Sequence, residues 1–169
     1  MSDLSVSWPG YQSGNGAETK APAVKVAVPE ACEMFPAFGN EMTVLLSGAD
    51  TGGKLAMCID VTPPGGGPPP HYHLNEDEWF FPLEGEVEFL LNGEWQAVAV
   101  GTAVFVPRGT VHTFRNVGSG YLKVLVQTTP SGFEIFFERC AAEFAKPGPP
   151  DMARITDIAA EHGIHFVTD

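Results

Sequence analysis

The sequence predicts an all-β domain followed by short helices at its C-terminal end. From Met42 onward, apolar runs such as TVLL, KLAMCIDV, EVEFLL and YLKVLVQTT alternate with turn residues, which is typical of a β-sandwich or barrel. Asn92-Gly93 between two apolar runs predicts a type I′ hairpin, which sets Val87 opposite Val98. No internal repeat is visible, so we expect one barrel.

Two segments after Pro130 have apolar residues at helical spacing, in place of the two-residue period of strands. The first is expected to bury one face formed by Phe133, Phe136, Phe137 and Cys140. The second is expected to bury Met152, Ile155, Ile158 and Ala159. We therefore expect an N-terminal arm at residues 1–39, a barrel at 40–130 and a C-terminal helical segment at 131–169.

Length, charge and cysteine content narrow the class of protein. A chain of 169 residues suits one domain, and its net charge of −12 disfavours binding to nucleic acid and to anionic membranes. The first twenty residues lack the basic and apolar regions of a secretory signal, so we expect a cytoplasmic protein. Widely spaced Cys32, Cys58 and Cys140 form no C-x-x-C pair and are expected to be reduced thiols.

Residues 63–86, PPGGGPPPHYHLNEDEWFFPLEGE, combine a stiff proline and glycine run with histidines and carboxylates. His71 and His73 are two residues apart, so on a strand both side chains point to one face. Glu78 follows at an odd offset from His73, which would place it on the opposite face of a continuous strand. The polar residues LNED between them predict a turn that resets the register and returns Glu78 to the two histidines.

A second segment, GTAVFVPRGTVHTFRN at residues 101–116, places His112 on a strand that follows a tight turn. Taken singly, these residues have ordinary explanations: a lone histidine on a strand is usually hydrogen-bonded or exposed, and Glu78 alone would be a surface charge. Three histidines and one glutamate, all placed by turns on short strands, are together a candidate metal-binding set. Imidazole and carboxylate ligands suit divalent iron, nickel, copper, zinc or manganese.

These two segments resemble the two motifs of the cupin family. The first motif has the spacing Gly, five residues, His-x-His, four residues, Glu, six residues, Gly, and is matched by Gly65, His71, His73, Glu78 and Gly85. The second has the spacing Gly, five residues, Pro-x-Gly, two residues, His, three residues, Asn, and is matched by Gly101, Pro107, Gly109, His112 and Asn116. The resemblance covers about residues 40–140 and is to single-domain cupins similar to the quercetin-dioxygenase-like group.

The resemblance implies a jelly-roll barrel, a double-stranded β-helix, with His71, His73, Glu78 and His112 as ligands of one divalent transition metal. Such a site has a net charge of about +1 and favours an anionic, oxygen-bearing ligand. By analogy with quercetin-type dioxygenases, Glu78 would also be the catalytic base. It would take a proton from an enol or hydroxyl of a small-molecule substrate that then reacts with dioxygen.

A resemblance of fold leaves the activity open, and two alternatives remain. The alternatives to a dioxygenase are another metal-dependent enzyme (a lyase, decarboxylase or isomerase) and a non-catalytic small-molecule-binding protein. Flavonol dioxygenases often carry two barrels, whereas this sequence predicts one. His162 and His165 are expected to have no metal role, and Arg108 is expected to be a surface charge.

Apolar residues close in sequence to the ligands are candidates for a substrate pocket: Met57, Phe80, Phe89 and Phe114. Trp79 and Phe81 alternate with Glu78 and Phe80, so they are expected to face outward from the barrel. An outward pair of large aromatic side chains needs cover. We therefore expect a homodimer.

Overall fold

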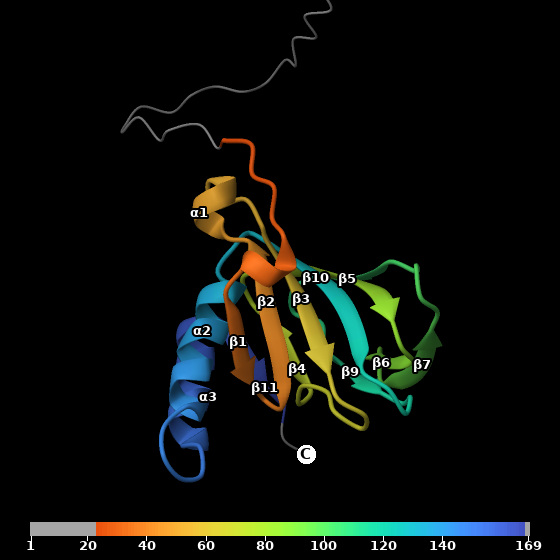
Figure 1. Cartoon of the computed structure of the whole chain (residues 1–169). Coiled ribbons are helices and arrows are strands. Elements are labelled where there is room, and N and C mark those ends of the chain that lie inside the picture. The colour runs from red at the N-terminus through yellow and green to blue at the C-terminus, as the bar shows by residue number, and fades with distance from the viewer. Residues whose placement is uncertain (1–22, 168–169) are drawn as a thin grey trace, which may run out of the picture.

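The computed structural model describes residues 23–167 as two antiparallel sheets that face each other in a barrel (Figure 1). The first sheet has the order β1 (Met34–Ala37), β2 (Asn40–Leu46), β3 (Ala56–Thr62), β10 (Leu122–Thr129), β5 (Asp77–Glu84) and β8 (Val104–Val106). The second has the order β11 (Ile164–Phe166), β4 (His71–His73), β9 (His112–Asn116), β6 (Val87–Leu91) and β7 (Glu94–Val98). This arrangement confirms the predicted all-β fold class.

The hairpin of β6 and β7 forms at the predicted place and in the predicted register. Asn92 and Gly93 have φ values of 54° and 82°, so both lie in the left-handed region that a type I′ turn requires. Val87 faces Val98 across the hairpin. On its other side β6 pairs with β9, where Glu88 faces Arg115.

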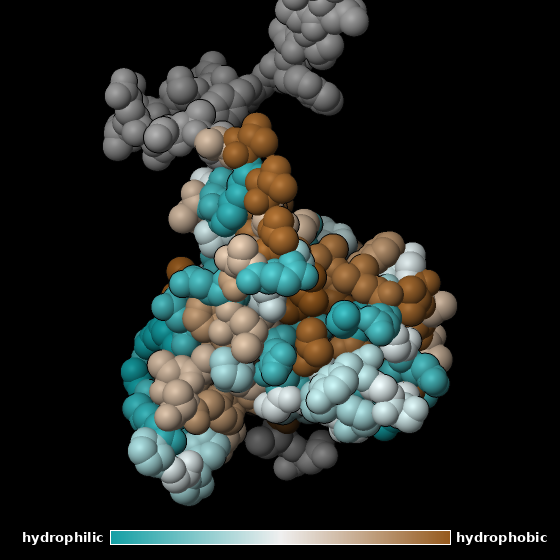
Figure 2. Space-filling view, in the orientation of Figure 1, coloured by the Kyte–Doolittle hydropathy of each residue, from teal (hydrophilic) through white to brown (hydrophobic). Residues whose placement is uncertain are grey.

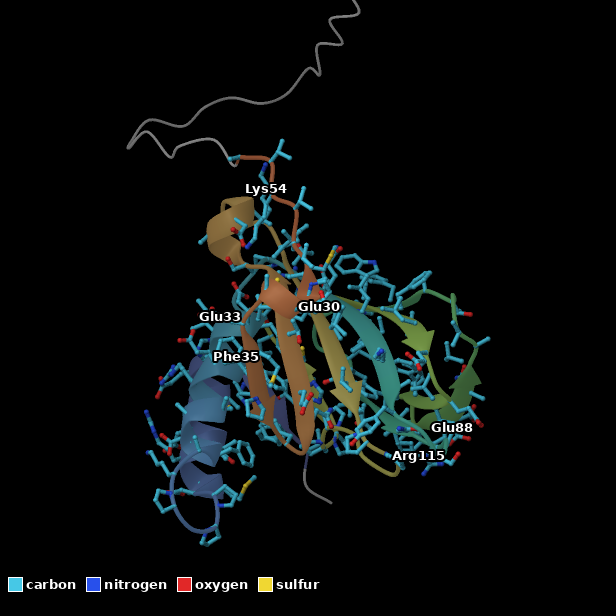
Figure 3. The ribbon with its side chains drawn as sticks, viewed as in Figure 1. Glu30, Glu33, Phe35, Lys54, Glu88 and Arg115 are labelled. Atoms are coloured by element: carbon cyan, nitrogen blue, oxygen red, sulfur yellow. The ribbon has the colours of Figure 1, made fainter. Side chains whose placement is uncertain are left out.

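The Glu88–Arg115 pair lies on the outside of the second sheet (Figure 3), with Oε2 of Glu88 2.5 Å from Nη2 of Arg115. The guanidinium of Arg115 also lies over the ring of Trp95, 4.0 Å from its centroid. An exposed ion pair of this kind contributes about 0–1 kcal/mol. The pair belongs to the same register of β6 and β9 that sets Leu91 opposite His112.

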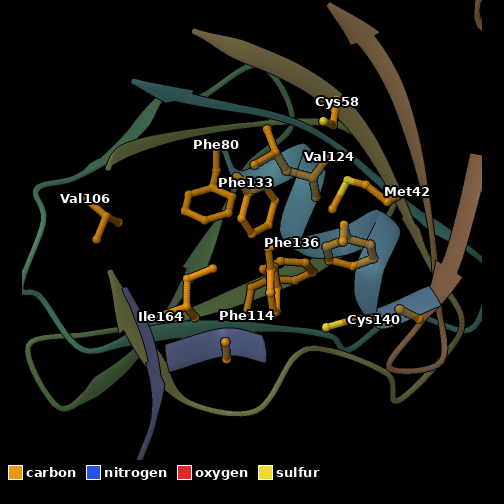
Figure 4. Packing of buried hydrophobic residues seen from close by; sticks show 14 of the residues in the cluster. Met42, Cys58, Phe80, Val106, Phe114, Val124, Phe133, Phe136, Cys140 and Ile164 are labelled. Carbon is orange, nitrogen blue, oxygen red and sulfur yellow. The ribbon is translucent and has the colours of Figure 1, made fainter. Parts of the chain in front are cut away.

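Every second side chain of the strands points into the barrel, where the core lies. On β3 the buried positions are Ala56, Cys58, Asp60 and Thr62. Figure 4 shows the centre of the core, in which Phe80 and Phe114 of the barrel lie with Phe133 and Phe136 of the helical segment. The three cysteines are free, and Cys58 and Cys140 are buried.

The helices lie beside the barrel, where α2 (Phe133–Phe144) packs against β1 and α3 (Met152–Glu161) (Figure 1). Two shorter elements, the 3-10 helix η1 (Pro29–Ala31) and α1 (Gly48–Thr51), precede β1 and β3. The predicted apolar face of α2 is buried throughout, whereas on α3 Met152 is 50% exposed and only the rest of the face is buried. Among residues 23–167, no helix has the length and hydrophobicity of a membrane span.

The ends of the barrel extend beyond the expected boundaries. Residues 1–22 of the expected arm lie outside the described residues, and residues 34–37 form β1, which pairs with β2. The C-terminal segment is not only helical, since β11 pairs with β4 and sets Ile164 opposite His73 and Phe166 opposite His71. A strand of three residues is too short to show an alternating pattern in the sequence.

The outer face of the first sheet is apolar, as the outward positions of Trp79 and Phe81 predict. Phe81 is 38% exposed and forms a cross-strand row with Leu125 and Ile59, while Trp79 is half-buried with its ring 4.8 Å from that of Phe105. In the space-filling view, hydrophobic residues gather over this side of the barrel (Figure 2). The homodimer stays a prediction, and this face is its candidate interface.

Candidate metal centre

Four polar side chains meet inside the barrel. His71 and His73 come from β4, His112 from β9 and Glu78 from β5, and all four are at most 7% exposed. Each residue offers one ligand atom, a ring nitrogen or a carboxylate oxygen, and these four atoms all lie within 4.8 Å of one another. The structure therefore brings together all four residues that the sequence singled out, in a cluster that could hold a metal ion.

Glu78 reaches the histidines by a change of sheet. Strand β4 ends at His73, and β5 begins at Asp77 in the opposite sheet, so residues 74–76 cross from one sheet to the other. The sequence analysis expected a turn that returned Glu78 to the histidines. The structure has the turn, but Glu78 faces the histidines across the barrel and does not share a sheet with them. The odd offset is accommodated because the two sheets point their inner faces at each other.

Each histidine of the cluster has a partner for Nδ1 outside the cluster. The partner of His71 is the carbonyl oxygen of Pro69, and that of His112 is the carbonyl oxygen of Thr110, each at 2.9 Å. The partner of His73 is the carboxylate of Glu76, at 3.3 Å. Because an oxygen accepts in each case, Nδ1 carries the hydrogen and Nε2 is left to face the interior. A metal-binding histidine is oriented in the same way.

His73 provides the test of whether a metal fits. Its Nε2 atom is buried and has no hydrogen-bond partner within the described part of the chain, and it lies 3.4 Å from Oε2 of Glu78. Buried polar atoms are almost always paired, so this one needs a partner. A divalent cation among three imidazoles and a carboxylate supplies it, and the donor set suits a transition metal.

The protonation states of the cluster also suit a metal. Burial works to raise the pKa of Glu78, but the charge of His73 and the hydrogen bond from His112 outweigh it and lower the pKa to about 2. Burial lowers the pKa of His71 to about 3, and the neighbouring imidazoles of His112 and His73 add to this effect. The carboxylate is thus ionised and the imidazole of His71 neutral, as metal coordination requires.

His112 is the exception among the three imidazoles. Burial opposes its protonation, yet the hydrogen bond and the charge of Glu78 raise the pKa of His112. Its Nε2 lies 2.9 Å from Oε2 of Glu78. A metal bound here would take the place of the proton between these two side chains.

Two contacts hold the loops that carry the cluster. The proline and glycine run before β4 passes close to β9, where a Cβ atom on Gly67 would lie 2.1 Å from the carbonyl oxygen of Phe114. Only glycine fits that approach. In the turn before β9, Arg108 forms a two-pronged ion pair with Asp77, with N–O distances of 3.0 and 2.9 Å. Arg108 remains at the surface, as expected, and ties the turn before His112 to the residue beside Glu78.

A cavity adjoins the cluster, and His71 and Glu78 form part of its wall. Half of the remaining lining residues are phenylalanines, namely Phe38, Phe80, Phe114, Phe133, Phe136, Phe137 and Phe166. Phe80 and Phe114, two of the four pocket candidates, thus line this cavity, and their contact with a substrate stays a prediction. Water is poorly accommodated by such a wall, so polar interactions inside it are stronger than at the surface.

The other two pocket candidates lie elsewhere. Phe89 is fully buried behind the cavity wall, with its ring centroid 5.2 Å from that of Phe80 and 5.6 Å from that of Phe114. The expectation for Met57 is wrong. Its neighbours Ala56 and Cys58 point into the barrel, so strand alternation directs Met57 to the outer face.

Several residues of the site were not found from the sequence. Glu76 is 3% exposed and contacts His73, although it reads as one of a group of surface acids. Asn40 and Asp60 line the cavity, and Phe166 of β11 closes part of it. Alternation puts Asp60 on the same face of β3 as Ala56 and Cys58, but only the structure shows that this face points inward.

Part of the chain is similar to a known protein family. Residues 59–128 match the family model described as cupin domain. Quercetin 2,3-dioxygenase of Bacillus subtilis is 32% identical over 88 residues, which are 52% of this chain but 26% of that protein. An uncharacterized protein of Aquifex aeolicus is 43% identical over 47 residues, 28% of this chain and 39% of its own length. The matches therefore span well under half of these two relatives.

A third relative is matched over most of its length. Tetracenomycin polyketide synthase protein TcmJ of Streptomyces glaucescens is 28% identical over 120 residues, which are 68% of this chain and 77% of that protein. Among solved structures, a predicted oxalate decarboxylase of Thermotoga maritima superposes with a TM-score of 0.58 at 26% identity, over 63% of this chain and 99% of the other. The polyketide cyclase RemF of Streptomyces resistomycificus superposes with a TM-score of 0.57 at 22% identity, over 64% and 81%. Residues 59–128 of this chain therefore match a cupin domain, and the superpositions show a shared fold.

Proposed function

We propose that this chain is a metal-dependent enzyme that acts on a small apolar molecule bearing an enol or hydroxyl group, and that it is a dioxygenase of the quercetinase type. The observation that carries the proposal is the unpartnered Nε2 of His73, buried beside an ionised Glu78. The cluster adjoins a cavity with a largely apolar wall rich in phenylalanine, which suits an apolar substrate. The similarity to a quercetin 2,3-dioxygenase supports the choice of reaction.

His71, His73, His112 and Glu78 would hold one divalent transition metal. When bound, such an ion makes a coordinated hydroxyl more acidic and, if redox-active, supports a reaction with dioxygen. The protein supplies the orientation, since each Nδ1 donates to an oxygen and each Nε2 faces the interior.

Glu78 is assigned a second role as the catalytic base. The low pKa of Glu78 keeps its carboxylate ionised throughout the physiological range, so an acceptor for the proton is always present. The same low pKa makes the carboxylate of Glu78 a weak base. Glu78 can therefore take a proton only from a group that is itself unusually acidic. The enol or hydroxyl of a substrate held at this site meets that condition.

The aromatic wall has a separate task. Phe80 and Phe114 of the barrel and Phe133 of α2 line the cavity beside His71 and Glu78. A ring of the substrate would pack against these side chains and displace water from the cluster. The anion formed by loss of the proton would then be protected from reprotonation by solvent.

Elemental analysis of the purified protein and a dioxygen electrode test the proposal together. One equivalent of a transition metal per chain is expected, together with dioxygen uptake that depends on an added flavonol or small diketone. His112→Ala, which removes one member of the cluster, should abolish both. A fully loaded protein that consumes no dioxygen with any compound of this class would reject the dioxygenase.

A non-oxidative reaction of a polycarbonyl substrate is the second candidate. It is favoured by the match to TcmJ, which covers 77% of that protein, against 26% of the quercetin dioxygenase. Glu78 would then take a proton from a carbon between two carbonyl groups, and the product would gain no oxygen. Conversion in the absence of dioxygen separates this reaction from the first. Binding without conversion under either atmosphere would indicate a non-catalytic binding protein.

A further inference from the structure

A second group of buried polar side chains lines the same cavity as the metal cluster. Asn40 begins β2 and Asp60 lies in β3, and they are 3% and 2% exposed. Both belong to the cavity wall, which also includes His71 and Glu78. Neither belongs to the four-residue cluster, and neither is used in the chemistry described above.

The hydrogen bonds of this group leave one acceptor of the described chain, Oδ1 of Asn40, without a donor. Nδ2 of Asn40 donates to both carboxylate oxygens of Asp60, at 3.2 and 3.1 Å. Thr62, which is fully buried and not part of the cavity wall, donates its hydroxyl to Oδ1 of Asp60. Oδ1 of Asn40 has no partner within residues 23–167. The wall therefore offers an amide oxygen and a carboxylate, which both accept hydrogen bonds.

A structural role alone does not account for this arrangement. No lysine, arginine or histidine of the described chain forms an ion pair with Asp60. Burial raises the pKa of Asp60 to about 6, against the hydrogen bonds from Thr62 and Asn40. An apolar pair at these positions would leave neither a buried carboxylate without a cationic partner nor an unpaired amide oxygen. Both features suit a site that awaits a hydrogen-bond donor.

We propose that Oδ1 of Asn40 and the carboxylate of Asp60 bind a hydroxyl group of the substrate, distinct from the oxygen that the metal cluster takes. The inference rests on the proposed function and narrows its substrate class. The substrate is an aromatic molecule with an oxygen ligand at one point and a hydroxyl donor at another. Its ring lies against the phenylalanines that share the wall with both polar groups, including Phe80 and Phe114.

Matched pairs of aromatic acids test this inference by binding. In each pair the carboxylate serves as the oxygen ligand, and the members differ by one phenolic hydroxyl: benzoate with 4-hydroxybenzoate, and 3-phenylpropanoate with 3-(4-hydroxyphenyl)propanoate. The two pairs differ in the reach of the hydroxyl. Dissociation constants are measured by calorimetry on the metal-loaded full chain at pH about 8, above the raised pKa of Asp60, which is about 6.

The hydroxylated member of at least one pair should bind about tenfold or more tightly than its partner. Asn40→Leu should bring this ratio close to one, and Asp60→Asn should reduce it several-fold. Thr62→Val is the control, because it removes a hydrogen bond from the same carboxylate but does not change the cavity wall. It should keep the ratio. Since each ratio is taken within one protein, a loss of stability in a variant does not affect it.

Equal binding of both members of each pair to the wild-type protein would overturn the inference and leave the proposed function intact. A preference that survives Asn40→Leu, or that Thr62→Val removes equally, would also overturn it, since the donor would then bind elsewhere. If no acid binds the metal-loaded chain, the assigned ligand class is wrong. The proposed function is judged independently, by metal content and dioxygen uptake.

Discussion

Nε2 of His112, on β9 of the second sheet, lies 2.9 Å from Oε2 of Glu78, on β5 of the first sheet. The contact joins the two sheets across the barrel and connects two motifs that are far apart in the chain. In the absence of metal, Glu78 raises the pKa of His112 and so favours a proton between these two side chains. Metal and proton therefore compete for this pair, and the predictions start from that competition.

Removal of the metal should lower thermal stability. A ligand bound to the folded state alone stabilises it by about 4 kcal/mol when present at a thousand times its dissociation constant. The melting temperature of the loaded protein should therefore fall on addition of a chelator. His73→Ala and His112→Ala should melt at the same temperature with and without chelator. A wild-type protein that loads metal yet shows no such fall would argue against ligation by the folded cluster.

Glu78→Gln should separate metal binding from turnover. Glutamine keeps the shape and an oxygen ligand but removes the charge and nearly all basicity. The variant should still bind metal, more weakly, and its turnover of an identified substrate should fall by at least about a hundredfold. A substrate analogue that is already ionised should recover part of the loss. Wild-type turnover by the fully loaded variant would exclude Glu78 as the base.

Glu76→Gln should weaken metal binding although Glu76 is outside the cluster. Its carboxylate accepts from Nδ1 of His73, which orients the ring and makes Nε2 a better ligand. Loss of such a partner costs about 10–100-fold in metal affinity, measured by competition with a chromophoric chelator. Glu94→Gln is the matched control, because Glu94 is exposed in the β6–β7 hairpin. Equal affinities for the two variants would show that Glu76 does not position His73.

Asp60 should make the protein less stable as the pH rises from about 4 to about 6. Burial raises the pKa of Asp60 from 3.8 to about 6, so the folded state holds its proton in a range where the unfolded chain has lost it. The stability that Asp60 contributes is fully present below pH 3.8, where both states hold the proton. It is lost as the pH rises through about 6. The shift corresponds to roughly 3 kcal/mol. Urea unfolding measures the free energy of unfolding of Asp60→Asn and of the wild type at pH about 4 and about 6. Relative to the wild type, the variant should gain stability of that order at the higher pH.

The homodimer is tested by light scattering. The row of exposed Phe81 with half-buried Leu125 and Ile59 on the outer face of the first sheet is the expected contact. A mass of twice the 18.1 kDa chain is expected at micromolar concentration, and Phe81→Glu should convert it to a monomer. A wild-type protein that elutes as a stable monomer would contradict the prediction.

Local chemistry was sufficient for some features of this chain. Asn92 and Gly93 tolerate positive φ, so they set the β6–β7 turn and with it the pairing of Val87 with Val98. The alternation of side chains along β5 placed Glu78 and Phe80 inward and Trp79 and Phe81 outward. Motif spacing singled out the three histidines and Glu78 before any fold was known. Each of these depends on spacing within one turn, one strand or one motif, which the sequence displays directly.

The tertiary structure decided what depends on contacts between distant segments. Sheet order places β5 opposite β4, so that Glu78 meets His73 across the barrel, and it places β3 beside β2, so that Asp60 meets Asn40. Phe166 reaches the cavity because β11 pairs with β4 from the far end of the chain. From the sequence, Met57 is as good a candidate for the pocket as Cys58. Only the structure shows which face of β3 points inward. Which strands become neighbours is set by packing of the whole core, because pairing energies are similar for many apolar strands and local patterns do not distinguish among them.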